Sequence, residues 1–340
     1  MKILMIGGTG TISSAITRQL AESGHDLWLL NRGNRKDEVP AGVKQLIADV
    51  NDEAEVLRQI GSEFFDAVCE FIGFLPSQVE RDLRLFAGRT RQYVYISSAS
   101  AYHKPVASPV ITEGTSLANP YWQYSRDKIA CEELLMREYR EKGFPVTIVR
   151  PSHTYCERAV PLSVHGLKGS WQVISRMLAG KPVIIHGDGS SLWTLTWNQD
   201  FARGFIGLLG NPKAIGEAFQ IMSDESLTWN QVYQCVADAL GVPLRACHVA
   251  SEFLAAVAPR EWDFTGNLLG DKAATVVFDC TKLKRAVPGF QCTTPFHQGV
   301  RRCIDHLTAH PELQMEDPEF DVWCDRVIEA QQKARGLLLT

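Results

Sequence analysis

The chain has 340 residues, which at roughly 150 residues per domain is enough for about two domains. Hydrophobic residues make up 45% of it and charged residues 22%, a balance that is typical of globular proteins and excludes wholesale disorder. With 35 Lys and Arg against 39 Asp and Glu, the net charge is −4. We therefore expect no nucleic-acid partner, because binding phosphates requires a basic surface.

Nine cysteines stand singly, without a CxxC pair, so we expect reduced thiols and no metal site. The first apolar run ends at Ile6, where two glycines follow. It is too short for a signal peptide or a membrane span. The expectation is a cytoplasmic protein with no membrane partner, and a homodimer is an assembly that the sequence leaves open.

Strands and helices alternate over the first 150 residues. The continuous apolar run Lys2–Ile6, stopped by glycines, predicts a buried first strand. Further strands are expected at 26–30, 43–48, 66–72, 92–97 and 146–149, and helices at 13–23, 52–61, 77–87 and 123–142. This alternation predicts an α/β fold, a Rossmann-type doubly wound parallel sheet with helices on both faces.

Beyond Arg150-Pro151 the alternation loosens, and loops rich in Pro, Gly and Ser separate helices expected near 171–179, 198–210 and 228–240. This change predicts a smaller C-terminal substrate-binding domain. We assign 1–153 to the dinucleotide-binding domain, with about 196–224 returning to it, 154–195 and 225–310 to the substrate-binding domain, and 311–340 to a C-terminal helical extension. The amphipathic stretch Phe320–Arg335 in that extension is interpreted as packing, with partner binding as the alternative.

A glycine-rich turn, Gly7-Gly8-Thr9-Gly10-Thr11-Ile12-Ser13, joins the first predicted strand to the first helix. Small residues let the backbone approach a pyrophosphate at the helix N-terminus. Ser13 stands where a third glycine would complete GxxGxxG, so an ordinary tight turn is the alternative. The residues expected to bind a dinucleotide here are Gly7, Gly10, Thr11 and Ile12.

The residues after the second strand bear on the choice of cofactor. An acidic residue there would bond a ribose 2′-hydroxyl and repel a 2′-phosphate, but the chain has Asn31-Arg32-Gly33-Asn34-Arg35-Lys36. NADP is therefore favoured, with Asn31 and Arg32 binding it. NAD stays open, because Arg32 could also stack on adenine.

Three side chains are candidates for catalysis. Tyr124 and Lys128 lie four residues apart, on one face of a predicted helix. A tyrosine has a pKa near 10, but an adjacent ammonium favours the phenolate and lowers that pKa toward neutrality. Ser98 follows the strand at 92–97, at the sheet edge where open α/β sheets bind ligands. An isolated Tyr and Lys pair is otherwise typical of core edge and solvated surface.

The segments YISSASAY (95–102) and YSRDK (124–128) together resemble the extended short-chain dehydrogenase/reductase family, the NAD-dependent epimerase/dehydratases. The resemblance continues through Arg150-Pro151, GDGS at 187–190 and DCTK at 279–282. It implies a catalytic triad and a cofactor site that includes an Asp-hydrophobic pair beside the adenine. The residues implied are Ser98, Tyr124 and Lys128 for catalysis, Lys128 also for the nicotinamide ribose, and Asp49 and Val50 for the adenine.

The departures from the family pattern narrow the substrate. Trp193 stands where nucleotide-sugar epimerases commonly have an arginine that holds the substrate diphosphate, and a later arginine is absent from Leu268-Leu269-Gly270-Asp271. Without both bidentate phosphate donors, a nucleotide sugar is disfavoured. Ala99-Ser100 stands where sugar dehydratases have Asp-Glu, so dehydration by their route is not expected.

Substrate-binding candidates are His103, His153 and Trp193. Either histidine could bond a hydroxyl or titrate, and the alternative is a solvated loop histidine. Trp193 and Trp197 could stack on a ring, and core packing is the alternative.

The predicted function is that of an NAD(P)-dependent epimerase or dehydrogenase/reductase acting on a carbinol or carbonyl of a small, sugar-like or otherwise polar molecule. Two alternatives remain. The glycine-rich and Asn-Arg-Gly segments also resemble those of chloroplast stem-loop RNA-binding proteins, and a non-catalytic dinucleotide sensor would show the same cofactor motif.

Overall fold

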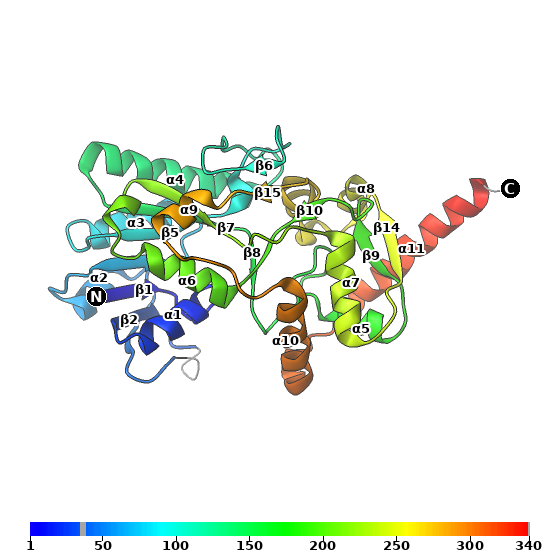
Figure 1. Ribbon diagram of the computed structural model, residues 1–340, viewed down its shortest axis with the longest axis horizontal. Coiled ribbons are helices and arrows are strands. Elements are labelled where there is room, and N and C mark those ends of the chain that lie inside the picture. Colours follow the sequence, from blue (N-terminus) through cyan, green and yellow to red (C-terminus); the bar gives the residue numbers. More distant parts are fainter. Residues whose placement is uncertain (35–38, 339–340) are drawn as a thin grey trace.

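The computed structural model describes residues 1–34 and 39–338 and contains a central sheet of seven parallel strands (Figure 1). Their order is β12-β7-β5-β4-β1-β2-β3. The strands are β1 (Lys2–Ile6), β2 (Asp26–Asn31), β3 (Lys44–Ile47), β4 (Ala67–Glu70), β5 (Tyr93–Ile96), β7 (Val146–Pro151) and β12 (Glu217–Ile221). The chain runs outward from β1 in both directions, so the topological switch point lies between β1 and β4. The predicted doubly wound α/β class is confirmed.

Helices cover both faces of this sheet. Along β1, Ile3 and Met5 pack on one face with α1 (Ser13–Glu22) and α6 (Asn198–Leu208). Leu4 and Ile6 pack on the other face with α2 (Glu53–Ile60), α3 (Pro76–Phe86) and α4 (Gln123–Lys142). Because both faces are buried, the central strands β1 and β5 are almost entirely apolar, whereas the edge strand β3 is mostly exposed.

The predicted strands and helices of the first 150 residues match these elements to within about two residues at most ends. The seventh strand, β12, was not predicted as a strand. It pairs with β7 at the edge of the sheet, and its first residue, Glu217, is exposed. Its apolar run is therefore short, because one side of an edge strand is open to solvent.

A second hydrophobic core lies beyond the carboxyl edge of the sheet, around Trp193, Trp229 and Tyr233. Its strands form two-stranded pairs: β6 (Val110–Ile111) with β15 (Val277–Phe278), β8 (His153–Tyr155) with β11 (Leu195–Trp197), β9 (Val183–His186) with β14 (Ala246–Val249), and β10 (Leu192–Trp193) with β13 (Leu227–Thr228). Its helices are α5 (Trp171–Leu178), α7 (Trp229–Leu240), α8 (Ser251–Val257), a π-helix at Thr265–Lys272 and α10 (Phe296–Ala309). A short helix, α9 (Thr281–Ala286), returns to the central sheet through Leu283.

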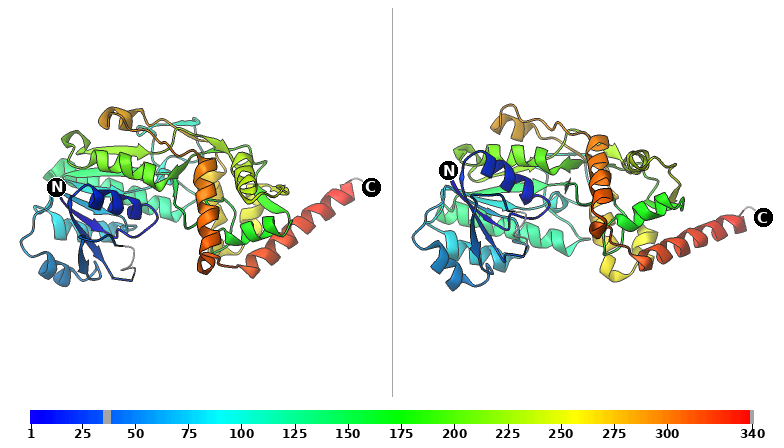
Figure 2. Two further views of the ribbon diagram at one scale, coloured as in Figure 1. Left: turned by 60° about the horizontal axis from the view of Figure 1, so that its bottom comes forward. Right: turned by 90° about the horizontal axis from the view of Figure 1, so that it is seen from below.

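The last helix, α11 (Pro318–Leu338), packs on this second core with its first half, through Phe320, Cys324 and Ile328. Its second half projects away from the body (Figures 1 and 2). The packing expected for Phe320–Arg335 therefore holds for the first half of the helix. Within 1–34 and 39–338, no helix is both long and apolar enough to cross a membrane.

Candidate active site at the carboxyl edge of the sheet

The glycine-rich turn after β1 has a geometry that side chains would disrupt. Gly7 and Gly8 have φ angles of 108° and 102°, and a Cβ on Gly8 would lie 2.8 Å from Leu29 Cδ2. Ser13 is buried at the position of the missing third glycine, and its Oγ accepts the N–H of Gly10 at 3.0 Å. No side chain caps α1, so its first N–H groups can bind a phosphate.

A cavity of about 830 Å³ extends from this turn along the carboxyl ends of the strands. Its volume and its backbone N–H groups fit a dinucleotide. Every predicted cofactor-binding residue lines it: Gly7, Gly10, Thr11, Ile12, Asn31, Arg32, Asp49, Val50 and Lys128. We call it the cofactor cavity.

Of the described residues directly after β2, 32–34, none is acidic, whereas Asp49, after the neighbouring strand β3, also lines the cofactor cavity. The Oδ1 atom of Asn31 accepts the N–H of Gly33 at 2.8 Å, which shapes the turn, and the side chain of Arg32 is exposed. Arg35 and Lys36, which contributed to the preference for NADP, lie outside the described residues.

Lys128 is buried beneath the cofactor cavity. Its Nζ donates to the carbonyl oxygen of Gly73 at 2.7 Å and to that of Ile96 at 2.8 Å. The same ammonium lies 4.6 Å and 4.8 Å from the ring centroids of Phe74 and Tyr95, and 5.9 Å from that of Tyr124. Burial lowers the pKa of Lys128 to about 8, although nearby acidic groups oppose the shift. Its carbonyl partners favour the charged ammonium.

Tyr124 and Ser98 lie beside each other. Burial raises the pKa of the Tyr124 phenol, and a hydrogen bond with the Ser98 side chain opposes that shift. A row of hydroxyls orients Ser98: its Oγ is 2.9 Å from Ser100 Oγ, which accepts the hydroxyl of Ser125 at 2.7 Å. The sequence thus places two hydroxyls and one buried ammonium together, from β5 and the first turns of α4.

A second cavity of about 240 Å³ opens on the other side of Ser98 and Tyr124. It is lined by both residues and also by Ala99, Ser100, Trp122, Pro151, Ser152, His153, Trp193, Asp271 and Lys272. We call it the substrate cavity. Ser98 and Tyr124 line both cavities, as do Pro151 and Ser152, so a group that spans the two lies beside the Ser98 and Tyr124 hydroxyls.

The substrate cavity contains two of the three predicted substrate-binding residues, His153 and Trp193. Burial, the charge of Lys272 and the nearby His165 lower the pKa of His153 to about 3, so its imidazole is neutral at physiological pH. A neutral imidazole both donates and accepts hydrogen bonds. Trp193 is 1% exposed and its Nε1 has no hydrogen-bond partner in the described chain.

His103 does not line either cavity. Its backbone N–H donates to the carbonyl of Ser116 at 2.8 Å, and the residue is half-buried. Trp197 also lies outside them and packs in the second core, 5.2 Å from Tyr155 between ring centroids. For Trp197 the alternative of core packing is the one observed.

Trp122, Asp271 and Lys272 line the substrate cavity but were not predicted as site residues. The π-helix Thr265–Lys272 brings the last two there by packing tightly on α4, since a Cβ on Gly266 would lie 2.1 Å from Trp122 Cδ1. Gly266 and Gly270 are the only hint of this close packing in the sequence of the π-helix, because a Cβ at either position would crowd Trp122.

A model of the NAD dependent epimerase/dehydratase family matches residues 3–221, well over half of the chain. The chain belongs to this family. The match covers the glycine-rich turn, Ser98 after β5, and Tyr124 with Lys128 on α4.

Two proteins of similar sequence have names that indicate different activities. The 2′-dehydrokanamycin reductase of Streptomyces kanamyceticus is 28% identical over 291 residues, which cover 86% of this chain and 80% of the reductase. The chloroplast stem-loop binding protein of 41 kDa b from Arabidopsis thaliana is 29% identical over 255 residues, covering 71% of this chain and 64% of that protein.

The fold is shared with solved epimerase structures. The epimerase Mth375 of Methanothermobacter thermautotrophicus has a TM-score of 0.74 at 17% identity, covering 92% of this chain and 93% of that one. UDP-glucuronic acid 4-epimerase from Bacillus cereus, solved in complex with NAD, has a TM-score of 0.70 at 18% identity, covering 91% and 99%. These likenesses establish a common fold.

Proposed function

We propose that this family member is an NAD(P)-dependent oxidoreductase that reduces a carbonyl, or oxidises the corresponding carbinol, on a small sugar-like substrate. The observation that carries the proposal is the junction of the two cavities at Ser98 and Tyr124. A nicotinamide dinucleotide bound in the cofactor cavity would supply the hydride donor or acceptor.

Each residue of the triad has a separate role in this proposal. Tyr124 transfers a proton to or from the substrate oxygen, and Ser98 donates a hydrogen bond to the same oxygen. Burial, and after it the charge of Asp271, raise the pKa of the Tyr124 phenol. In this proposal the ammonium of Lys128, 5.9 Å from the Tyr124 ring centroid, acts against that shift by favouring the phenolate.

The substrate cavity supports a substrate without a nucleotide. At about 240 Å³ it has less than a third of the volume of the cofactor cavity, about 830 Å³, whereas a nucleotide sugar approaches a dinucleotide in size. Trp193 lines it, at the position where nucleotide-sugar epimerases commonly have an arginine that holds the substrate diphosphate. Hydroxyls, a neutral His153 and an aromatic wall suit a sugar ring or a related polyol.

Reduction is favoured over the other reactions of the family. The similar protein from Streptomyces kanamyceticus is named for reducing 2′-dehydrokanamycin. Ala99 and Ser100 line the substrate cavity where sugar dehydratases have an acid and a base. We therefore propose ketone reduction, with NADP as the preferred cofactor because Arg32 follows β2 and none of the described residues 32–34 is acidic.

The test is a turnover screen of sugar and polyol ketones, including 2′-dehydrokanamycin, with NADPH and NADH. The expected result is cofactor oxidation that is lost in Tyr124→Phe. Nucleotide-sugar turnover at a higher kcat/KM than any nucleotide-free ketone would contradict the proposed substrate class.

RNA binding is the function suggested by the name of the Arabidopsis relative. The net charge of −4 does not favour it. A filter-binding assay with a stem-loop RNA at low salt should show no retention, and saturable retention would favour this second function.

A further inference from the structure

The turn between β4 and α3 borders the cofactor cavity and also contacts Lys128, which lines the same cavity. Ile72 and Phe74 are 40% and 45% exposed and line the cavity. Between them, the carbonyl of Gly73 accepts the Lys128 ammonium at 2.7 Å and the hydroxyl of Tyr95 at 3.0 Å. The Gly73 carbonyl is therefore one of the two carbonyl groups, with that of Ile96, that fix where the ammonium lies relative to Tyr124.

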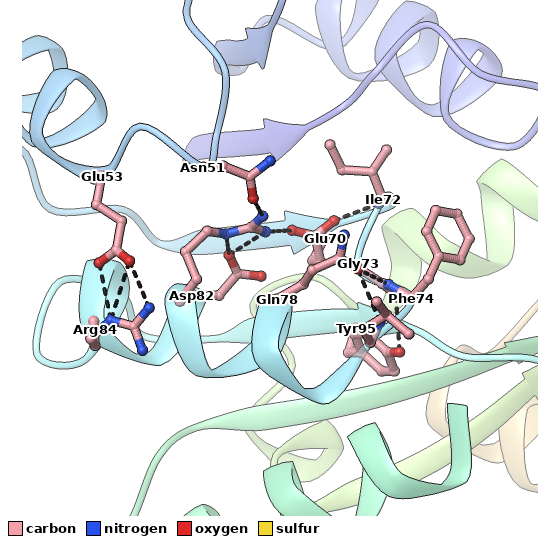
Figure 3. Close-up of polar contacts among 12 residues, drawn as sticks. Asn51, Glu53, Glu70, Ile72, Gly73, Phe74, Gln78, Asp82, Arg84 and Tyr95 are labelled. Atoms are coloured by element: carbon pink, nitrogen blue, oxygen red, sulfur yellow. Dashed lines mark hydrogen bonds and ion pairs between the residues drawn. The ribbon is translucent and has the colours of Figure 1, made fainter. Parts of the chain in front are cut away.

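Side chains hold this turn at both ends (Figure 3). At the strand end, Glu70 Oε1 accepts the N–H of Ile72 at 2.5 Å. At the helix end, Gln78 Oε1 accepts the N–H groups of Phe74 at 2.6 Å and Leu75 at 3.0 Å. The stem of Glu70 also packs directly against Gly73, where a Cβ would lie 3.0 Å from Glu70 Cγ.

Glu70 is itself held in a buried polar network. Arg81 donates to Glu70 at 3.3 Å, to Asp82 at 2.7 Å and to Asn51 at 2.8 Å, and Asp82 accepts the hydroxyl of Tyr93 at 2.7 Å. Glu70 and Asp82 are 0% exposed and Arg81 is 3% exposed. One guanidinium thus faces two fully buried carboxyl groups.

The charge of this network balances when one carboxyl group is protonated. Burial, followed by the proximity of Asp82, raises the pKa of Glu70 well above its usual range, although Arg81 and the N–H of Ile72 oppose the shift. A protonated Glu70 leaves Asp82 paired with Arg81, which avoids an uncompensated buried charge.

We propose that Glu70 is a positioning residue for the reaction: by fixing the peptide of Ile72 and Gly73, it makes the Gly73 carbonyl hold the Lys128 ammonium beside Tyr124. This inference rests on the proposed function, since it takes Tyr124 as the proton-transfer group. Glu70 acts through its hydrogen bond and its packing, and its negative charge is not required.

The groups that face Glu70 allow these two modes of action to be separated. They are Cys69 of β4, Arg81 and Asp82 of α3, Tyr93 of β5 and Lys128 of α4. An ionised Glu70 would raise the pKa of Lys128 directly. If Glu70 only holds the turn, a neutral amide at this position, as in Glu70→Gln, would hold it equally well.

Three variants and one control follow. Glu70→Gln keeps an acceptor for the N–H of Ile72 and loses the ionisable group, whereas Glu70→Ala loses the acceptor. Gly73→Ala places a methyl group 3.0 Å from Glu70 Cγ, so it shifts the turn relative to the Glu70 stem while keeping the Glu70 carboxyl group and every charge of the buried network. Glu53→Gln is the matched control, because Glu53 pairs with Arg84 of the same helix α3 but lies apart from the turn (Figure 3).

The measurement is an ultraviolet difference titration of tyrosine ionisation in the full chain saturated with NADP⁺, taken for each variant with and without an added Tyr124→Phe change. The difference isolates Tyr124 and needs no substrate. We expect Glu70→Gln and Glu53→Gln to leave its midpoint unchanged. Gly73→Ala and Glu70→Ala should raise it by about one pH unit, since an ammonium that loses a carbonyl partner supports the phenolate less well.

An unchanged midpoint in Gly73→Ala would overturn the inference, even if Glu70→Ala fails to fold. A shift in Glu70→Gln as large as that in Gly73→Ala would assign the effect to charge and also overturn it. If the titration finds no Tyr124 ionisation below about pH 10, the ordinary value, and Tyr124→Phe keeps its turnover, the proposed function itself fails.

Discussion

At the scale of single residues, the proposed function depends most directly on Arg32, after β2 in the cofactor cavity, and on the buried ammonium of Lys128. Arg32 is exposed at the end of β2, and none of the described residues 32–34 is acidic and able to bond a ribose 2′-hydroxyl. A positive charge here favours a phosphate over a hydroxyl, so a reversal of that charge should reverse the preference.

We expect Arg32→Asp to change the preferred cofactor from NADPH to NADH, with the ratio of the two affinities moving by about tenfold or more, the effect of a charge-assisted contact. Fluorescence titration of the parent and the variant with both dinucleotides measures it. A parent chain that binds NADH more tightly would show that the proposed NADP preference is wrong.

Lys128 couples function to stability. Its pKa is lowered to about 8 in the folded chain by burial, from an ordinary value near 10.5. Between these values the unfolded chain binds more protons than the folded one, so this residue makes stability rise as pH increases from about 8 to 10.5.

Lys128→Met should abolish this part of the pH dependence. We expect the free energy of unfolding of the parent minus that of the variant to increase from pH 7.5 to pH 10, which denaturant titrations of both chains would measure. A difference that stays flat or falls over this interval would mean that the ammonium is not destabilised by burial.

At the scale of elements, two cations hold α11 to the body in addition to its apolar packing: the buried Arg176, and Lys181, whose Nζ contacts Asp321 at 2.8 Å and Asp325 at 3.1 Å. Arg176 of α5 is 1% exposed, and its guanidinium contacts Asp321 Oδ1 at 2.6 Å and Asp325 Oδ1 at 2.8 Å, both on α11. The two aspartates are partly exposed, so solvent screens part of this attraction. The contact lies far along the chain from the triad and fastens the helix without entering either cavity.

Arg176→Met should therefore destabilise the fold by about 1 to 3 kcal/mol, because it removes the charge and leaves the packing volume. Cofactor affinity should stay within about twofold, a free-energy change of less than 0.5 kcal/mol. Thermal unfolding and NADPH titration of the same preparation test both statements. Loss of cofactor affinity without loss of stability would show that α11 communicates with the cofactor cavity.

At the scale of the whole molecule, local sequence patterns predicted what local physics determines. Apolar runs such as Lys2–Ile6 predicted the buried strands, and the four-residue spacing of Tyr124 and Lys128 placed both on one face of α4. The positive φ angles of Gly7 and Gly8 likewise agree with the expected phosphate-binding turn.

The features of the site that the sequence did not predict depend on contacts between segments far apart in the chain. The ammonium of Lys128 meets a carbonyl 55 residues away, at Gly73, and Asp271 reaches the substrate cavity only because the π-helix packs on Trp122. The burial of Glu70 could not be predicted from the sequence near it. A single acidic residue at the end of a strand gives the same sequence pattern whether its side chain is solvated or buried. Such placements follow from tertiary packing, which spacing along the chain does not encode.

The junction of the two cavities is the proposed reaction centre, and Tyr124→Phe is the most direct test of that proposal. The change deletes the phenolic oxygen and keeps the ring, which packs 4.9 Å from Trp122 between centroids. Steady-state turnover of the best ketone from the screen, measured with NADPH affinity on the same protein, should show a loss of about two to four orders of magnitude in kcat and nearly unchanged cofactor binding. A variant that keeps more than about a tenth of the parent kcat would contradict the account.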